Sequence, residues 1–184
     1  HLKPIDPMQK IVALLPARYA ATRFPGKLMK DLLGKSIILR TYEAVQNTGL
    51  FDEVIVVCDH PILFDEIISH GGKAMMSSTE HESGSDRIAE AARQIEADII
   101  VNVQGDEPFI QKEALQRVIA LFENPEVQVG SLMLPISDPE RMHNPNCVKV
   151  VVDHQHRALY FSRASIPFNR DASQSVTAFQ HIGV

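Results

Sequence analysis

The sequence predicts an α/β fold in which a mostly parallel sheet is flanked by helices. Two observations support this prediction. Short apolar, β-rich segments alternate with segments of helical periodicity, and polar loops containing glycine follow the first and the fourth of these apolar segments. The chain has 184 residues, of which 45% are hydrophobic and 22% charged, so it is long enough to bury a substantial core.

The first part of the chain contains the strand and helix patterns in strict alternation. The predicted strands are residues 11–15, 54–58, 74–76 and 99–103. Ser36 is expected to cap a helix that ends at Gly49, and Pro61 to open a second helix that is closed by two glycines. A third helix is expected to begin within residues 83–86, and a fourth spans about residues 112–123. This order predicts a parallel sheet with helical crossovers.

After Val129 the pattern changes. Residues 129–134, 148–152 and 158–161 have the pattern of strands without long helices between them, which indicates an antiparallel extension of the fold. Residues 1–7 resemble a remnant of recombinant expression, because a strand is predicted soon after Met8. We therefore expect residues 8–184 to form a single domain, and the abrupt apolar ending FQHIGV indicates that its C-terminal part is lacking.

Composition excludes several classes of partner. The chain has 18 Lys and Arg residues against 23 Asp and Glu residues, a net charge of −5, so no overall basic field favours nucleic acid or an anionic membrane. The sequence contains no apolar run of transmembrane length and no secretory leader pattern. Its two cysteines are far apart and lack metal-ligand spacing. We expect a cytoplasmic protein.

A cationic loop follows the first predicted strand. Within LLPARYAATRFPGK, three cations, Arg18, Arg23 and Lys27, lie close to a glycine that lets the backbone approach a ligand. One guanidinium group can bind two phosphate oxygens at once, and an ammonium group adds a compact positive charge. In a parallel sheet, the loop after the first strand is a frequent phosphate contact. The loop therefore predicts a triphosphate site, although a solvated loop would have a similar composition.

An acidic turn follows the fourth predicted strand, in the segment NVQGDEP. Mg²⁺ prefers one or two carboxylates together with substrate phosphates, so Asp106 is a candidate ligand, although Gly-Asp is also common in ordinary turns. In EHESGSDR, the residues Ser83, Gly84 and Arg87 would suit a base edge or a sugar hydroxyl, but the same letters are typical of a helix cap. Later in the chain, Arg163 would suit a substrate carboxylate.

Six segments together resemble the CMP-KDO synthetases, or 3-deoxy-manno-octulosonate cytidylyltransferases. They are PARYAATRFPGK, HESGSDR, VNVQGDEP, NPNCVKVV, ALYFSRASIP and HIG, and they occur in the order found in that family. The resemblance implies a Rossmann-like nucleotide-diphospho-sugar transferase fold. It also implies transfer of CMP from CTP to 3-deoxy-D-manno-octulosonate (KDO), with release of pyrophosphate, in lipopolysaccharide biosynthesis. Mg²⁺ is the implied cofactor, and the family usually forms homodimers through its later strands.

The resemblance also assigns expected roles to residues of this chain. Arg18 and Lys27 would hold the triphosphate with support from Arg23, and Asp106 would bind Mg²⁺, so that Arg18, Lys27 and Asp106 form the catalytic set. The expected cytidine pocket comprises or adjoins Ala17, Ser83, Gly84 and Arg87. The sugar acid would face Gln104, Arg163 and His181, with Arg163 pairing with its carboxylate.

One departure from the family pattern concerns the second metal carboxylate. The family carries it in an Asp-Thr-Pro-type segment near the C-terminus, and no such segment occurs among these 184 residues. We therefore expect the chain to bind CTP better than it turns it over. Two alternatives remain open at the level of sequence. One is a cytidylyltransferase for 8-amino-KDO or sialic acid, and the other is a CTP-binding module without catalysis.

Overall fold

The computed structural model describes residues 9–20, 25–78, 81–171 and 176–184. The chain divides into two compact units, residues 1–130 together with Val184 and residues 131–183. The antiparallel extension expected after Val129 therefore forms a unit of its own, and the grouping of residues 8–184 into a single domain stays a prediction. No helix in the described ranges has the length and apolar character needed to cross a membrane.

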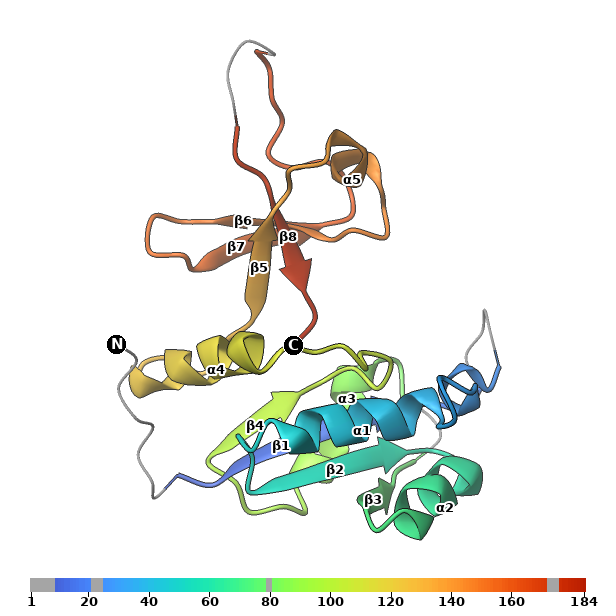
Figure 1. The fold of residues 1–184 in the computed structure, drawn as a ribbon. Coiled ribbons are helices and arrows are strands. Elements are labelled where there is room, and N and C mark those ends of the chain that lie inside the picture. Colours follow the sequence, from blue (N-terminus) through green and yellow to red (C-terminus); the bar gives the residue numbers. More distant parts are fainter. Residues whose placement is uncertain (1–8, 21–24, 79–80, 172–175) are drawn as a thin grey trace. The chain divides into compact units, whose positions relative to one another are not determined.

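The first unit is built on a four-stranded parallel sheet (Figure 1). Its strands lie in the order β3-β2-β1-β4, and their bounds are β1 (Ile11–Ala17), β2 (Glu53–Cys58), β3 (Lys73–Met76) and β4 (Ile99–Asn102). All three pairings are parallel, so the four carboxyl ends lie along one edge. The chain moves outward from β1 to β3 and then returns to the other side of β1. The switch in strand order therefore lies between β1 and β4, where ligands of open α/β sheets usually bind.

The helices of this unit begin where the sequence predicts. Ser36 caps α1 (Ile37–Asn47) by accepting a hydrogen bond from Leu39 N, and Gly49 follows the helix with a φ of 66°. Pro61 opens α2 (Pro61–Ser69), and Ser83 caps α3 (Gly84–Ala92). The expected fourth helix is α4 (Lys112–Ala120) followed by the 3₁₀ turn η2 (Leu121–Glu123). One further 3₁₀ turn, η1 (Lys27–Met29), was not predicted.

Both faces of the parallel sheet are covered. On one face, Val12, Leu14, Ile55 and Val57 pack with Ile88 and Ala91 of α3. The intervening β1 residues point to the other face, because side chains alternate along a strand, and α1 crosses β1 and β2 on that side (Figure 1). Since β1 is buried along almost its whole length, it forms the rigid centre from which the following loop emerges.

The second unit contains an antiparallel sheet in the order β5-β8-β6-β7. Its elements are β5 (Leu132–Pro135), α5 (Pro139–His143), β6 (Lys149–Val152), β7 (Ala158–Ser162) and β8 (Phe179–Ile182). The expected start of the first of these strands at Val129 is wrong, because β5 begins at Leu132 and Val129 is 88% exposed. The helix α5 was not predicted, because its five residues are too few to show helical periodicity.

Candidate active site

The cationic loop and the acidic turn meet at the carboxyl edge of the parallel sheet. Lys27 follows β1 and Asp106 follows β4, and the Lys27 Nζ atom lies 2.5 Å from Asp106 Oδ2. Both side chains are accessible, with exposed fractions of 48% and 40%. Two oppositely charged groups from segments 79 residues apart thus lie together at the switch in strand order.

A tight backbone turn at Gly26 positions Lys27. Gly26 has a φ of 68°, a left-handed conformation that side chains other than that of glycine rarely permit. Its N–H donates to the Tyr19 carbonyl at 2.8 Å, which closes the loop at its base. Lys27 then begins η1, whose Leu28 side chain is buried. The ammonium group therefore stands on a short helical turn that is anchored in the core.

Asp106 is positioned by the close approach of the segment after β4 to the end of β1. A Cβ on Gly105 would lie 2.8 Å from the Pro16 carbonyl oxygen of β1 and 3.1 Å from Ile38 Cδ1. Only glycine fits such a gap without displacing backbone. Just before it, Val103 N donates to the Leu14 carbonyl and extends the pairing of β4 with β1. The acidic turn is therefore pressed against the end of β1.

A third segment, the polar loop before α3, reaches the same edge. Arg18 Nη2 donates to the Glu82 carbonyl at 3.3 Å, and Gly84 lies against the Pro16 ring, where an added Cβ would meet Cγ at 3.3 Å. Ser83 and Asp86 form a reciprocal capping box. The pKa of Asp86 is lowered, chiefly because the Ser83 hydroxyl donates a hydrogen bond to it. The loop therefore caps α3 and also lies beside the cationic loop, so its role as a helix cap is compatible with a role in nucleotide binding.

Two residues expected near the nucleotide are buried. Arg87 is fully buried, and its guanidinium group donates to Asp59, to the Ser77 hydroxyl and to the Ser78 carbonyl. Ala17, at the end of β1, is 1% exposed, and its contact with a nucleotide stays a prediction. Direct contact of Arg87 with a nucleotide stays a prediction, and the structure gives this side chain internal partners. Arg23 lies outside the described residues.

The residues expected to face a sugar acid lie in both units. Gln104 belongs to the first unit, where its carbonyl accepts from Glu107 N in the acidic turn. Arg163 and His181 belong to the second unit. There, His181 N donates to the Val148 carbonyl, and Ser162, just before Arg163, pairs with Lys149.

Within the second unit, neighbours orient both of these side chains. Arg163 is exposed and donates through Nη1 to the Pro145 carbonyl at 2.8 Å. The His181 ring lies 2.7 Å from the Ser131 hydroxyl, and burial lowers its pKa, which favours the neutral imidazole at pH 7. Lys149 is fully buried and donates to three carbonyls, one of which is that of Arg163. This lysine was not among the residues predicted from the sequence.

Asp59 and His60, directly after β2, also escaped the sequence analysis. Asp59 Oδ1 accepts from Tyr19 N at 2.9 Å, and the His60 ring stacks on that of Tyr19 with centroids 4.2 Å apart. The available signal was a polar pair at the carboxyl end of a predicted strand, the same signal that identified Asp106. The partners of this pair could not be predicted, because they lie 28 and 40 residues away along the chain.

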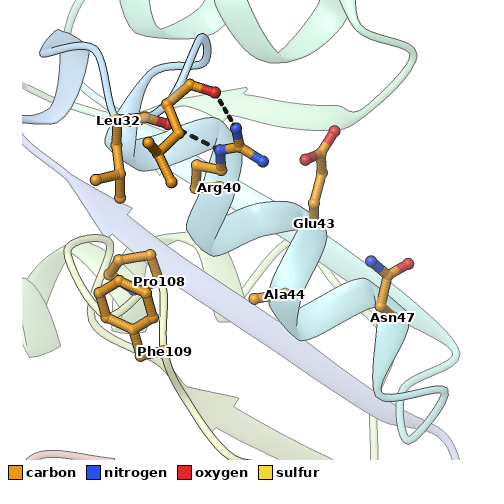
Figure 2. A pocket seen from close by; sticks show the side chains of 8 residues that line it. Leu32, Arg40, Glu43, Ala44, Asn47, Pro108 and Phe109 are labelled. Atoms are coloured by element: carbon orange, nitrogen blue, oxygen red, sulfur yellow. Dashed lines mark hydrogen bonds between the residues drawn. The ribbon is translucent and has the colours of Figure 1, made fainter.

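A cavity of about 300 Å³ lies beside α1, and neither Lys27 nor Asp106 lines it. Figure 2 shows Arg40 on α1 with its guanidinium turned toward the carbonyls of Leu32 and Leu33, which accept its hydrogen bonds. Phe109 lines the opposite side. Another lining residue, Glu43, pairs with Lys35. Since its charged groups have internal partners and it includes no expected site residue, this cavity is not the candidate site.

The candidate site offers an incomplete set of metal ligands. In the part of the chain that the structure describes, no three His, Cys, Asp or Glu side chains gather into a metal-binding group. Asp106 presents an accessible carboxylate beside a cationic loop. This donor set fits Mg²⁺ that takes most of its ligands from substrate phosphates and water.

The chain is similar in sequence to known cytidylyltransferases. A cytidylyltransferase family model matches residues 12–184. The 3-deoxy-manno-octulosonate cytidylyltransferase of Flavobacterium johnsoniae is 56% identical over 178 residues, with 95% of this chain and 73% of the relative covered. That of Christiangramia forsetii is 54% identical over 178 residues, with 95% and 72% covered.

A solved structure agrees with these relatives. The structure of CMP:2-keto-3-deoxy-manno-octonic acid synthetase complexed with CTP superimposes with a TM-score of 0.88 at 39% identity, covering 95% of this chain and 72% of that one. The expected nucleotide-diphospho-sugar transferase fold is therefore confirmed. The chain belongs to the family of 3-deoxy-manno-octulosonate cytidylyltransferases.

Proposed function

We propose that the chain transfers CMP from CTP to KDO, giving CMP-KDO and pyrophosphate for lipopolysaccharide biosynthesis. The observation that carries this proposal is the meeting of Lys27 and Asp106 at the switch in strand order, with Arg18 on the same loop as Lys27. Membership of the family supports the choice of both substrates. In the reaction, the anomeric hydroxyl oxygen bonds to the α-phosphorus, the bond to pyrophosphate breaks, and the hydroxyl proton is lost.

Lys27 and Arg18 stabilise the charge that develops on the phosphoryl oxygens and on the departing pyrophosphate. This reaction needs no protein nucleophile, so positioning and charge stabilisation account for most of the catalysis. Lys27 and Asp106 neutralise each other across 2.5 Å. Binding of the triphosphate gives Lys27 a new anionic partner and frees the Asp106 carboxylate.

Mg²⁺ belongs to the same proposal. Asp106 would hold the ion, which supplies electrostatic stabilisation of the triphosphate charge when bound. Its carboxylate is accessible and stands beside the predicted phosphate loop, as a cation shared with substrate requires. The release of Asp106 from Lys27 and the binding of the magnesium complex of CTP are thus expected to occur together.

Specificity for the sugar acid, the oligomeric state and the compartment are further parts of the proposal. Arg163 would pair with the KDO carboxylate, and Gln104 and His181 would also face the sugar acid. A homodimer in the cytoplasm follows from the family resemblance. The exposed apolar side chains of the edge strand β7, with Leu159 and Tyr160 both 65% exposed, support pairing through a second copy.

A pyrophosphate-release assay tests the reaction. The chain is incubated with CTP and Mg²⁺ and with KDO, 8-amino-KDO or sialic acid, in parallel with titration calorimetry of CTP. We expect release with KDO that exceeds release with the other two acids. Faster release with one of those acids would reassign the substrate, whereas CTP binding without any release would indicate a nucleotide-binding module.

A further inference from the structure

We propose that Asp59 is a positioning residue for CTP, which holds the cationic loop after β1 and the polar loop before α3 in one arrangement. This inference rests on the proposed function, because it assumes that these loops bind the nucleotide. Asp59 directly follows β2, which lies between β1 and β3 in the sheet. Its side chain is 11% exposed, and its two carboxylate oxygens accept hydrogen bonds from different partners, Tyr19 and Arg87. It acts through its neighbours rather than on the ligand.

The first oxygen of Asp59 holds the cationic loop. Oδ1 accepts from Tyr19 N at 2.9 Å, directly beside Arg18 in sequence. The Tyr19 ring stacks on His60 at an interplanar angle of 21°, and the Tyr19 carbonyl accepts from Gly26 N at 2.8 Å. Tyr19 is therefore fixed at its N–H, its ring and its carbonyl. Through it, the two ends of the loop that carries Arg18 and Lys27 are tied to the end of β2.

The second oxygen of Asp59 holds the polar loop before α3. Oδ2 accepts from Arg87 Nη2 at 3.1 Å, and Arg87 also donates to the Ser77 hydroxyl and to the Ser78 carbonyl at 3.2 Å. Ser77 in turn donates from its backbone to the Cys58 carbonyl at 2.9 Å. The buried guanidinium group thus joins the end of β3, the beginning of α3 and Asp59.

The two loops also touch each other directly, since Arg18 donates to the Glu82 carbonyl. Among the described residues of the two loops, that contact is one accessible hydrogen bond of 3.3 Å, which cannot by itself fix two loops. Asp59 provides a second, buried link between them. A ligand that binds both loops pays less entropy when they are already held in place, so loss of the link should appear as weaker CTP binding.

The first test compares Asp59→Asn with Glu53→Gln. Asparagine keeps an acceptor for Tyr19 N but places an amide where Arg87 needs a carboxylate. Glu53 is the matched control, because it is the carboxylate at the other end of β2 and pairs with Lys10 and Lys73, which are not among the expected site residues. In titration calorimetry with CTP and Mg²⁺, we expect Asp59→Asn to raise Kd by about tenfold or more with unchanged stoichiometry. We expect Glu53→Gln to stay within about twofold of the unaltered chain.

Stoichiometry separates positioning from a purely structural role. A variant that only folds less completely would show fewer binding sites of unchanged Kd, and that result would overturn the inference. Equal Kd values for Asp59→Asn and Glu53→Gln would overturn it as well. In the pyrophosphate assay, Asp59→Asn should raise KM for CTP more than KM for KDO.

Asp59→Asn removes the carboxylate that pairs with the buried Arg87, and this loss can prevent folding. In that case a second pair of variants tests the inference. Tyr19→Ala removes the stack on His60 but keeps Asp59 and Arg87 together, and Tyr19→Phe keeps the stack. We expect Tyr19→Ala to weaken CTP binding by about tenfold and Tyr19→Phe to restore it. Equal affinity of both variants and the unaltered chain would contradict the inference.

The unaltered chain distinguishes this inference from the proposed function. If it binds CTP and releases pyrophosphate while Asp59→Asn and Tyr19→Ala bind CTP normally, the positioning role fails and the proposed function stands. If the unaltered chain neither binds CTP nor releases pyrophosphate, the proposed function fails and the positioning role fails with it.

Discussion

At the scale of single residues, the pair of Lys27 and Asp106 defines the candidate site. Both side chains are accessible, so solvent screens their attraction and the pair contributes at most about 1 kcal/mol to stability. A triphosphate and Mg²⁺ offer each partner a stronger interaction. The pair can therefore separate when substrate binds, and its residues are expected to matter far more for activity than for folding.

Replacement of Lys27 by alanine should show this difference. Removal of one preorganised group that stabilises transition-state charge costs about 2.7–4 kcal/mol, so we expect kcat to fall by about 10²–10³-fold with little change in melting temperature. Lys35→Ala is the matched control, because Lys35 pairs with Glu43 on α1 and is not an expected site residue. Near-normal turnover of Lys27→Ala in the pyrophosphate assay would refute the role assigned to Lys27.

Glu53 provides a stability test that is independent of the site. Its pKa is lowered from 4.5 to about 2, chiefly by its hydrogen bond with Lys10 and then by that with Lys73. Because the folded-state pKa lies below the unfolded value, the stabilisation is present above pH 4.5 and is lost as the pH falls toward 2. The two lysines are 41% and 62% exposed, which limits each pair to at most about 1 kcal/mol.

We therefore expect Glu53→Gln to lower the free energy of unfolding by about 1 kcal/mol at pH 7. Urea unfolding of both proteins at a series of pH values should show this difference shrinking between pH 4.5 and pH 2. A difference that stays constant over this range would mean that the ion pairs do not stabilise the folded state.

At the scale of elements, local signals in the sequence predicted the parallel half of the fold. Ser36 and Ser83 cap the helices that they were expected to cap, and Pro61 opens α2. These signals act within one turn of a helix, so they can be recognised without tertiary information. The parallel alternation also placed the cationic loop and the acidic turn at the carboxyl ends of strands, whereas the order of the strands was not predicted from the sequence.

The features that sequence analysis missed depend on distant partners. Asp59 acquires its importance from Tyr19 and Arg87, and Gly105 from its approach to Pro16. No periodicity or spacing encodes such contacts. Arg87 is a further example, because the motif HESGSDR did not indicate that this side chain is buried and bonded to Asp59.

The contact between Gly105 and β1 leads to a prediction for this element. An added Cβ would lie 2.8 Å from the Pro16 carbonyl oxygen, so Gly105→Ala must displace the acidic turn or the end of β1. We expect a loss of about 1–3 kcal/mol in the free energy of unfolding, together with weaker CTP binding. Gly84→Ala is a milder comparison, since its Cβ would meet only the Pro16 ring, at 3.3 Å. Equal stability of Gly105→Ala and the unaltered chain would contradict the close packing.

At the scale of the whole molecule, the chain combines a parallel unit that carries the predicted nucleotide residues with an antiparallel unit that carries Arg163 and His181. The edge strand β7 of the antiparallel sheet exposes several apolar side chains. An uncovered apolar edge strand favours pairing with another chain. The proposed homodimer would cover this strand.

A charge on this strand should therefore prevent assembly. We expect the unaltered chain to elute as a dimer in size-exclusion chromatography with light scattering, and Leu159→Glu to shift it toward the monomer. Val129→Glu is the control, because Val129 is 88% exposed but lies outside the β7 strand. A Leu159→Glu variant that remains dimeric would place the interface elsewhere.

The central claim is that the cationic loop and the acidic turn bind one triphosphate and its Mg²⁺. Titration calorimetry of CTP with and without Mg²⁺, on the unaltered chain and on Asp106→Asn, tests it most directly. We predict that Mg²⁺ strengthens CTP binding to the unaltered chain and that Asp106→Asn loses this gain, while its metal-free affinity is equal or higher because Lys27 is released. An Asp106→Asn variant that responds to Mg²⁺ as the unaltered chain does would contradict the claim.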